Sequence, residues 1–194
     1  ASMLTLDKVY HAKYILKEAI RDTDMLSAPI LRPDCELYLK SENLQVTGSF
    51  KVRGAGYMIS QLSEEEKKRG IIACSAGNHA QGVALAAREM GIKATIVMPK
   101  AAPIAKVQAT EGYGAKVVLH GDCYDDAYAK AMEICQQEGA TFLHPYNDPD
   151  VIAGQGTLGL EILSDLPYVD VIIVPAGGGG RGYELPRGQA FCQL

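Results

Sequence analysis

One lysine of the chain stands among neighbours that suit covalent chemistry. Lys51 lies in the segment 47–55, between the aromatic Phe50 and the apolar Val52, with glycines close on both sides. These neighbours favour partial burial, which disfavours the ammonium form, lowers the pKa of the amine and leaves it nucleophilic enough to form an imine. The charge of the nearby Arg53 would act in the same direction. Taken alone, the segment also fits an ordinary surface lysine at the start of a helix.

A second candidate is the polar loop Ser75-Ala76-Gly77-Asn78-His79, which follows an apolar run and leads into a predicted helix. Backbone amides at a helix N-terminus bind anions such as phosphate or carboxylate, and Gly77 lets the chain approach a ligand closely. In open α/β sheets, ligands lie beyond the carboxyl ends of the strands, where this loop is expected. A plain strand-to-helix turn with Asn78 as the N-cap is the alternative.

A third candidate is the run Gly177-Gly178-Gly179-Gly180, which follows another apolar segment. Successive glycines place backbone amides around a phosphate with no side chain in the way. The run matches neither the Walker A pattern nor G-x-G-x-x-G, so it does not specifically indicate a nucleotide. A flexible linker is the alternative.

The elements that must position these loops alternate between helix and strand. Apolar runs of strand length occupy 71–74, 94–98, 115–119, 141–143 and 169–174, and helices are predicted at 79–90, 104–111, 124–138 and 157–164. Strands that are apolar throughout and are separated by helices indicate a parallel sheet covered on both faces. The predicted fold class is therefore α/β. A helix at 5–22 and a strand at 36–40 show a different pattern and suggest another layer or domain.

Two helix starts are marked by capping residues. Ser63 and Glu66 form a capping box, and the short helix that they begin should stop at Gly70. Carboxylates also crowd the start of the helix 124–138, where they complement the positive helix end. We interpret these acids as caps and not as catalytic acids; they are Asp122, Asp125 and Asp126.

The composition is that of a soluble globular protein. The 194 residues are 47% apolar and 22% charged. The net charge of −4 and the pI of about 5.6 provide no basic field for nucleic acid or for an anionic membrane. No apolar stretch approaches the roughly 20 residues of a membrane span, and the first residues lack the pattern of a signal peptide. We therefore predict no nucleic-acid partner and no membrane partner.

The five cysteines indicate a reducing compartment. Their number is odd and their spacing shows no pairs, which is typical of reduced thiols in a cytoplasmic protein. The chain has four histidines and neither C-x-x-C nor H-x-x-x-H, so we predict no metal site. The expected location is the cytoplasm.

Taken together and in this order, the three loops resemble those of fold-type II pyridoxal-phosphate enzymes, and specifically those of threonine dehydratases. The resemblance runs from about residue 4 to residue 180. It is specific, because the related cysteine synthases carry other residues around their lysine and a Thr-Ser-Gly-Asn-Thr type second loop. The segments that carry it are 41–45, 49–54, 75–82, 97–99, 114–115, 152–157 and 177–180.

The resemblance implies pyridoxal 5′-phosphate as the cofactor and Lys51 as the catalytic residue, which holds the cofactor as a Schiff base and then moves the proton from Cα. Phe50 would pack by the pyridine ring, Asn78 would hydrogen-bond the 3′ oxygen, and Asn147 would also reach the cofactor. The resemblance implies that the substrate carboxylate is bound by Ser75, Gly77, Asn78 and His79. It also implies that the phosphate is bound by Gly177, Gly178, Gly179 and Gly180.

The reaction that the resemblance implies is the dehydration and deamination of L-threonine to 2-oxobutanoate and ammonia, with L-serine to pyruvate as a side activity. This reaction belongs to amino-acid metabolism, isoleucine biosynthesis included. A serine dehydratase or serine racemase is an alternative. Racemases of this kind carry a second serine where this chain has Ala76, which favours elimination over racemisation. A non-catalytic α/β binding module is the alternative outside the enzymes.

The resemblance also predicts the domain organisation. A complete small α/β domain is expected over 43–147, and a large domain that is only partial over 1–42 and 148–180. The tail 181–194 departs from the family, has no helical or strand period, and contains Pro186, which would break a helix. We therefore expect a truncated chain. We also expect a homo-oligomer that covers the strand 169–174, because that strand lacks neighbours.

Overall fold

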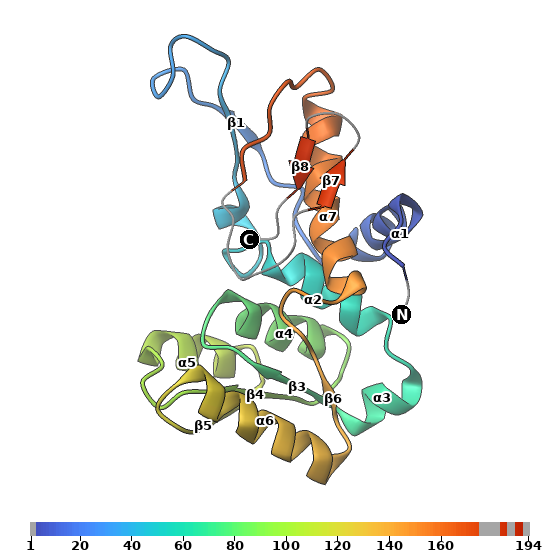
Figure 1. Cartoon of the computed structure of the whole chain (residues 1–194), viewed down its shortest axis with the longest axis vertical. Helices are drawn as coiled ribbons and strands as arrows, with labels where there is room; N and C mark the ends of the chain where they lie inside the picture. The colour runs from blue at the N-terminus through green and yellow to red at the C-terminus, as the bar shows by residue number, and fades with distance from the viewer. Residues whose placement is uncertain (1–2, 175–182, 186–188, 192–194) are drawn as a thin grey trace.

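The computed structural model describes residues 3–174, 183–185 and 189–191. A parallel sheet with helices on both faces forms one end of the molecule, and the helices α1 and α7 with two short strands form the other (Figure 1). The helix α2, Lys51–Ser60, lies between the two ends. No helix in the described part of the chain is both long and apolar enough to pass through a bilayer.

The parallel sheet has the strand order β5-β4-β3-β6. Its pairs are all parallel, with Ile72 opposite Thr95 and Thr95 opposite Lys116. The predicted α/β class and the predicted parallel sheet are therefore confirmed. The strands are β3 Ile71–Cys74, β4 Ala94–Met98, β5 Lys116–Leu119 and β6 Thr141–Phe142.

Alternate residues of the strands face two different cores, as the pleat of a strand requires. One core contains Ala73, Ile96 and Met98 and is covered by α2 and α4, Asn78–Glu89. The other contains Ile72 and Val97 and is covered by α6, Tyr124–Glu138. Both faces are apolar, which explains why the strands read as continuous apolar runs in the sequence.

The predicted caps are present in the structure. Ser63 and Glu66 form a reciprocal capping box at the start of α3, Glu64–Arg69. At α6 the carboxylate of Asp126 accepts backbone N–H groups from Asp122 and Cys123, at 2.9 and 3.3 Å. The interpretation of Asp126 as a cap is confirmed. The remaining helix of the sheet, α5, spans Ile104–Gly112.

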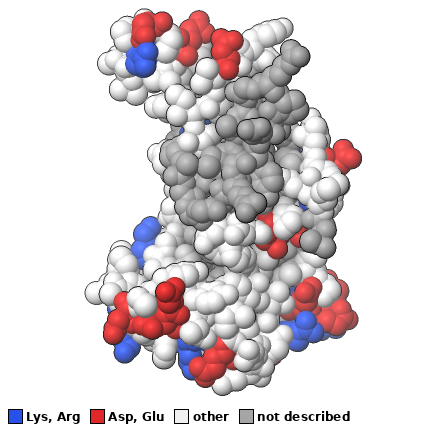
Figure 2. Space-filling view, in the orientation of Figure 1, with Lys and Arg blue, Asp and Glu red and all other residues white. Residues whose placement is uncertain are grey.

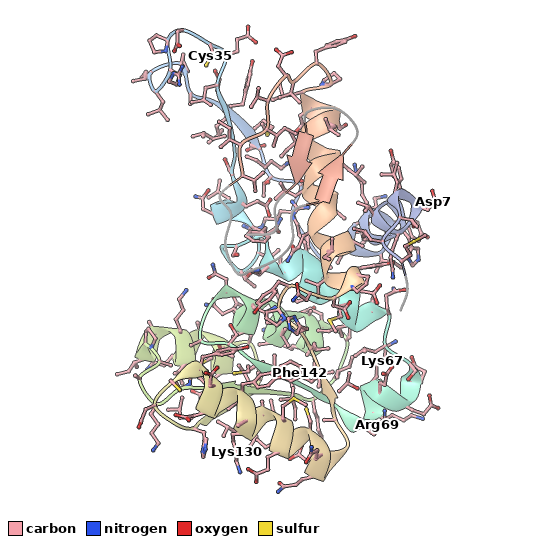
Figure 3. All side chains as sticks on the ribbon, viewed as in Figure 1. Asp7, Cys35, Lys67, Arg69, Lys130 and Phe142 are labelled. Carbon is pink, nitrogen blue, oxygen red and sulfur yellow. The ribbon has the colours of Figure 1, made fainter. Side chains whose placement is uncertain are left out.

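The other end of the molecule is less regular. Helix α1, Leu6–Leu16, packs against α7, Pro149–Asp165. The strands β1, Met25–Ser27, and β2, Tyr38–Lys40, pair antiparallel, and the single 3₁₀ turn η1, Glu42–Leu44, follows them. Cys35 lies in the projecting loop that joins β1 to β2 (Figure 3).

Five predictions about this end need correction. The helix predicted at 5–22 ends at Leu16. The strand predicted at 36–40 begins only at Tyr38, and its partner β1 was not predicted. The helix predicted at 157–164 begins eight residues earlier, because Asp148 caps its N-terminus and Pro149 occupies its first turn, a position that suits proline.

The fourth correction concerns the apolar run 169–174, which forms no strand. A strand needs a neighbour for its backbone hydrogen bonds, and the described residues place none beside this run. Val171 and Ile173 are accordingly 68% and 83% exposed. The tail, predicted to lack a strand period, contains the antiparallel pair β7 Tyr183–Leu185 and β8 Gln189–Phe191.

Candidate active site

A cavity of about 470 Å³ lies where the carboxyl edge of the sheet meets the start of α2. This is the edge at which ligands bind in open α/β sheets. The volume falls within the range of small-molecule sites. The cavity is lined by Lys51, Cys74, Ser75, Ala76, Asn78, His79, Tyr124, Pro145 and Tyr146. The structure thus brings the predicted reactive lysine and the predicted polar loop together, although 23 residues or more separate them in sequence.

Lys51 is the first residue of α2 and is partly buried. Burial lowers the pKa of its amine below the ordinary value for lysine. Its Nζ lies 5.1 Å from the centre of the Phe50 ring, in a cation–π contact. The amine therefore loses its proton more readily than a surface lysine does.

The loop before α4 presents polar groups to the same cavity. Ser75 Oγ accepts the N–H of Gly77 at 3.2 Å, which leaves the hydroxyl hydrogen of Ser75 available to donate. Gly77 is the N-cap residue of α4, and no side chain caps the first turn of this helix. The open amides at the N-terminus of a 12-residue helix suit an anion such as a carboxylate.

Asn78 begins α4, and its Oδ1 accepts a hydrogen bond from Lys106 Nζ at 3.4 Å. With the carboxamide in this orientation, its NH₂ group is turned toward other partners. The amide can then donate to a ligand in the cavity, as the prediction for Asn78 requires.

His79 is the most unusual group on the cavity wall. It is 4% exposed, and neither ring nitrogen has a hydrogen-bond partner among the described residues. Burial and the charge of Lys51 lower the pKa of His79 to about 4, against a smaller opposing effect of the Leu143 backbone. Buried polar groups are rarely left without partners in native proteins, so this imidazole is a ready contact for a ligand.

Two tyrosines of the wall were not predicted. Tyr124 is the first residue of α6, and burial raises the pKa of its phenol to about 12. Tyr146 follows β6, and its backbone N–H, like that of Asn147, is directed at His144 Nδ1, at 3.4 and 3.0 Å. Both residues come from loops at the carboxyl edge of the sheet, so the rule that placed the Ser75 loop could have found them.

Not every predicted residue lines the cavity. Asn147 is exposed, and its neighbour Tyr146 occupies the wall instead, so contact of Asn147 with a cofactor stays a prediction. Phe50 lies beneath the amine of Lys51 but is not part of the lining. The predicted phosphate loop Gly177–Gly180 lies outside the described residues.

The charged side chains on the face seen in Figure 2 are of mixed sign. Lysine, arginine and acidic side chains alternate around the sheet end of the molecule on the face seen in Figure 2. The cavity instead provides an amine, a hydroxyl, an amide and an imidazole within one concave surface, which is the chemistry of a small polar ligand.

The burial of His79 predicts a specific loss of stability in acid. The imidazole has a pKa of 6.5 when unfolded and about 4 when folded, so the unfolded chain binds more protons between these values. The contribution of the neutral His79 to the free energy of unfolding is complete above pH 6.5 and is lost as the pH falls toward 4. It amounts to about 3 kcal/mol. Denaturant unfolding at pH 7.5, 5.5 and 4 measures it. His79→Gln should flatten this part of the pH dependence, and an unchanged slope in that variant would contradict the assignment.

Comparison with known proteins defines the class that the fold and the cavity belong to. Residues 16–182 match the family described as pyridoxal-phosphate dependent enzyme, and the chain belongs to this family. It is 55% identical over 180 residues to the L-threonine ammonia-lyase of Thermotoga maritima, covering 92% of this chain and 45% of that protein. It is 52% identical to the L-threonine dehydratase catabolic TdcB of Escherichia coli K12, covering 91% of this chain and 54% of the relative.

Solved structures agree with this assignment. Maize serine racemase superposes with a TM-score of 0.89 at 34% identity, over 92% of this chain and 55% of that one. The processed form of threonine deaminase isoform 2 from Solanum lycopersicum gives 0.82 at 39% identity, over 91% and 50%. The fold-type II architecture is confirmed, and the chain spans about half the length of the relatives it matches.

The residues that line the cavity fit pyridoxal phosphate. The aldehyde of this cofactor requires an amine that can lose its proton, and the pKa of Lys51 is lowered. His79, which has no well-formed hydrogen bond among the described residues, and the uncapped amides of α4 add hydrogen-bonding groups that a ligand can use. These features belong to the same wall as Lys51, so one ligand can use all of them.

Proposed function

We propose that the protein catalyses the pyridoxal-phosphate-dependent dehydration and deamination of L-threonine to 2-oxobutanoate and ammonia, with L-serine to pyruvate as a side activity. One observation carries the proposal: Lys51, whose pKa is lowered, and the uncapped N-terminus of α4 line the same cavity. The two threonine-specific relatives at 52–55% identity support the choice of substrate.

Each side chain has a distinct task in this proposal. Pyridoxal phosphate, when bound, withdraws electrons from the carbon next to the substrate nitrogen. Lys51 holds the cofactor and, as a neutral amine, moves the proton on the substrate Cα. The substrate carboxylate is bound by Ser75, Gly77, Asn78 and His79, and the cofactor is held by Phe50, Asn78, Asn147 and Gly177–Gly180.

We also propose the organisation in which this site works. The small domain spans 43–147, and the parts 1–42 and 148–180 belong to the large domain. We infer a cytoplasmic homo-oligomer. The thiols Cys35, Cys74, Cys123 and Cys135 are free, which supports a reducing compartment. The exposed apolar run 169–174 supports association with a further surface.

Serine racemisation is the second candidate, because a serine racemase shares this fold closely. Ala76 argues against it. This residue lines the cavity next to Ser75 and has no group that could donate a proton to the second face of Cα.

Product analysis tests the proposal. In a chimera in which this chain replaces the matched segment of the Thermotoga maritima relative, L-threonine should yield 2-oxobutanoate and ammonia in equal amounts. L-serine should yield pyruvate with little D-serine, because Ala76 cannot protonate the second face. Ala76→Ser is the informative variant, since it adds the hydroxyl. Comparable rates of pyruvate and D-serine formation in the unsubstituted chimera would overturn the dehydratase assignment, and the relative itself serves as the control for a functional assay.

A further inference from the structure

We propose that Gly82 is a positioning residue for Lys51: α4 places the bare Cα of Gly82 against the peptide group that follows Lys51, and this contact sets how deeply the amine lies in the cavity. The proposal rests on the proposed function for its effect on turnover, but its geometry is independent of it.

The contact between Gly82 and α2 is made by backbone atoms. A Cβ built at Gly82 would lie 3.0 Å from the nitrogen of Val52 and 3.1 Å from both the carbonyl carbon and the carbonyl oxygen of Lys51. Ordinary van der Waals contacts of a Cβ begin at 3.4 Å. Since the neighbours are main-chain atoms, no side-chain rotation can relieve the overlap, and any larger residue must push the two helices apart.

A displacement of α2 away from α4 is resisted, because α7 packs closely against its other side. Figure 1 shows α2 between these two helices. A Cβ at Gly154 of α7 would lie 2.5 Å from the carbonyl oxygen of Arg53 and 2.7 Å from the Cα of Gly54. A Cβ at Gly54 would in turn lie 2.9 Å from the carbonyl oxygen of Val151. A glycine contact on each side therefore fixes the start of α2 between α4 and α7.

The Arg53 side chain adds a further restraint on α2. It is 0% exposed and donates to both carboxylate oxygens of Glu42 and to both of Glu161, at distances from 2.6 to 2.9 Å. Arg53 follows Lys51 by two residues, so these bonds hold the same turn of helix that carries the amine.

The position of Gly82 also couples Lys51 to the wall of the cavity. His79 lies three residues before Gly82, which places both on the same side of α4. The spacing that Gly82 allows between the helices therefore also affects how far Lys51 lies from the imidazole. A methyl group at Gly82 would widen this gap and admit water. The added water would raise the pKa of the Lys51 amine back toward the ordinary value for lysine. The other titratable groups on the cavity wall, Cys74, Tyr124 and Tyr146, come from neither helix.

Gly82→Ala tests the proposal, with two matched controls in the same chain. Gly156→Ala also introduces a methyl at a tight helix contact, 3.1 Å from Val9 Cγ1 on α1, but not against α2. Gly112→Ala introduces one where nothing lies within 4 Å. The readout is the reactivity of Lys51 toward acetic anhydride as a function of pH, quantified by mass spectrometry of the Lys51 peptide. A second readout is the rate at which pyridoxal phosphate becomes fixed to Lys51 under borohydride.

We expect Gly82→Ala to raise the pH at which Lys51 becomes reactive and to slow cofactor attachment several-fold, as a displacement of a few tenths of an ångström predicts. Gly156→Ala should lower stability without altering either readout, and Gly112→Ala should change neither. A folded Gly82→Ala whose Lys51 titrates and reacts as in the unsubstituted chain would overturn the proposal.

Two further measurements keep the outcome decisive. If Gly82→Ala does not fold, Ala55→Ser enlarges the same α2–α4 interface one turn along by a single atom, since Ala55 packs in the core with α4. Ala55→Ser should also raise the pH at which Lys51 becomes reactive, but by a smaller amount. An unchanged reactivity of Lys51 in this variant counts against the proposal. If pyridoxal phosphate attaches to no variant, the proposed function fails, while the acetic anhydride titration still decides the role of Gly82.

Discussion

Lys51→Ala should abolish ammonia release from L-threonine in the chimera and leave no pyridoxyl group on the protein after borohydride reduction. The side chain is the only described amine on the cavity wall, and burial lowers its pKa. In the proposed mechanism its loss removes both the attachment point of the cofactor and the base for the Cα proton, so turnover should fall by several orders of magnitude. The measurements are ammonia release and mass spectrometry of the tryptic peptide that contains residue 51.

The control for this substitution is Lys130→Ala. Lys130 lies on α6 at the outer surface of the sheet end (Figure 3) and is not among the residues that line the cavity. Among the ion pairs of the described residues it pairs only with Glu133. An exposed pair of this kind contributes little to stability, so the variant should behave as the unsubstituted protein does. If the Lys51→Ala variant turned over L-threonine as fast as the Lys130→Ala variant, the functional assignment would lose its basis.

Arg53→Met should destabilise the protein by about 3–5 kcal/mol at neutral pH, the cost of breaking a buried ion pair by removing one partner. The substitution leaves Glu42 and Glu161 without their main cation, and only Lys40, at 2.8 Å, remains on Glu161. Denaturant unfolding measures the loss as a lower midpoint. Arg88→Met is the matched control, because Arg88 pairs with Glu89 at the surface and should cost less than about 1 kcal/mol.

The pH dependence of this loss distinguishes charge from packing. Burial by itself would raise the pKa of Glu161, but the bonds from Arg53 and Lys40 outweigh it and hold the pKa below the usual value. In Arg53→Met the burial effect is no longer opposed by Arg53, so the pKa of Glu161 rises. The carboxyl group then accepts a proton in mild acid, and the difference in stability should shrink as the pH falls. A difference that is constant with pH would indicate lost packing alone.

The fold of the sheet end could be predicted because its signals are local. Each apolar run from 71 to 143 contains one strand, and Ser63 and Gly70 mark the ends of α3 by hydrogen bonds to residues of the same helix. The run 169–174 has the same local pattern but no partner in the described structure, and a strand is a property of a pair of segments. Helix α7 was predicted too short because Gly154 and Gly156 weaken the helical signal, whereas in the structure they serve close helix packing.

The site was predictable where one segment carries the chemistry. Lys51 and the Ser75 loop each have a local motif, and both line the cavity. Tyr124 and Tyr146 have no such motif, because only the parallel order of β5, β4, β3 and β6 brings their loops to the same edge. The burial of His79 was likewise hidden, since it depends on how α4 packs against the start of α2.

The bonds of Arg53 to Glu161 join residues 108 positions apart. This separation has a consequence for the order in which a newly synthesised chain acquires its site. Proteins are made from the N-terminus, so the strands of the sheet, complete at Phe142, leave the ribosome before the helix that carries Glu161 has been made. Until then α2 packs against α4 and α1 but lacks α7, and Arg53 lacks one of its two carboxylates. We therefore expect Lys51 to reach its final place, and the proposed attachment of the cofactor to it to occur, only after translation has passed Asp165.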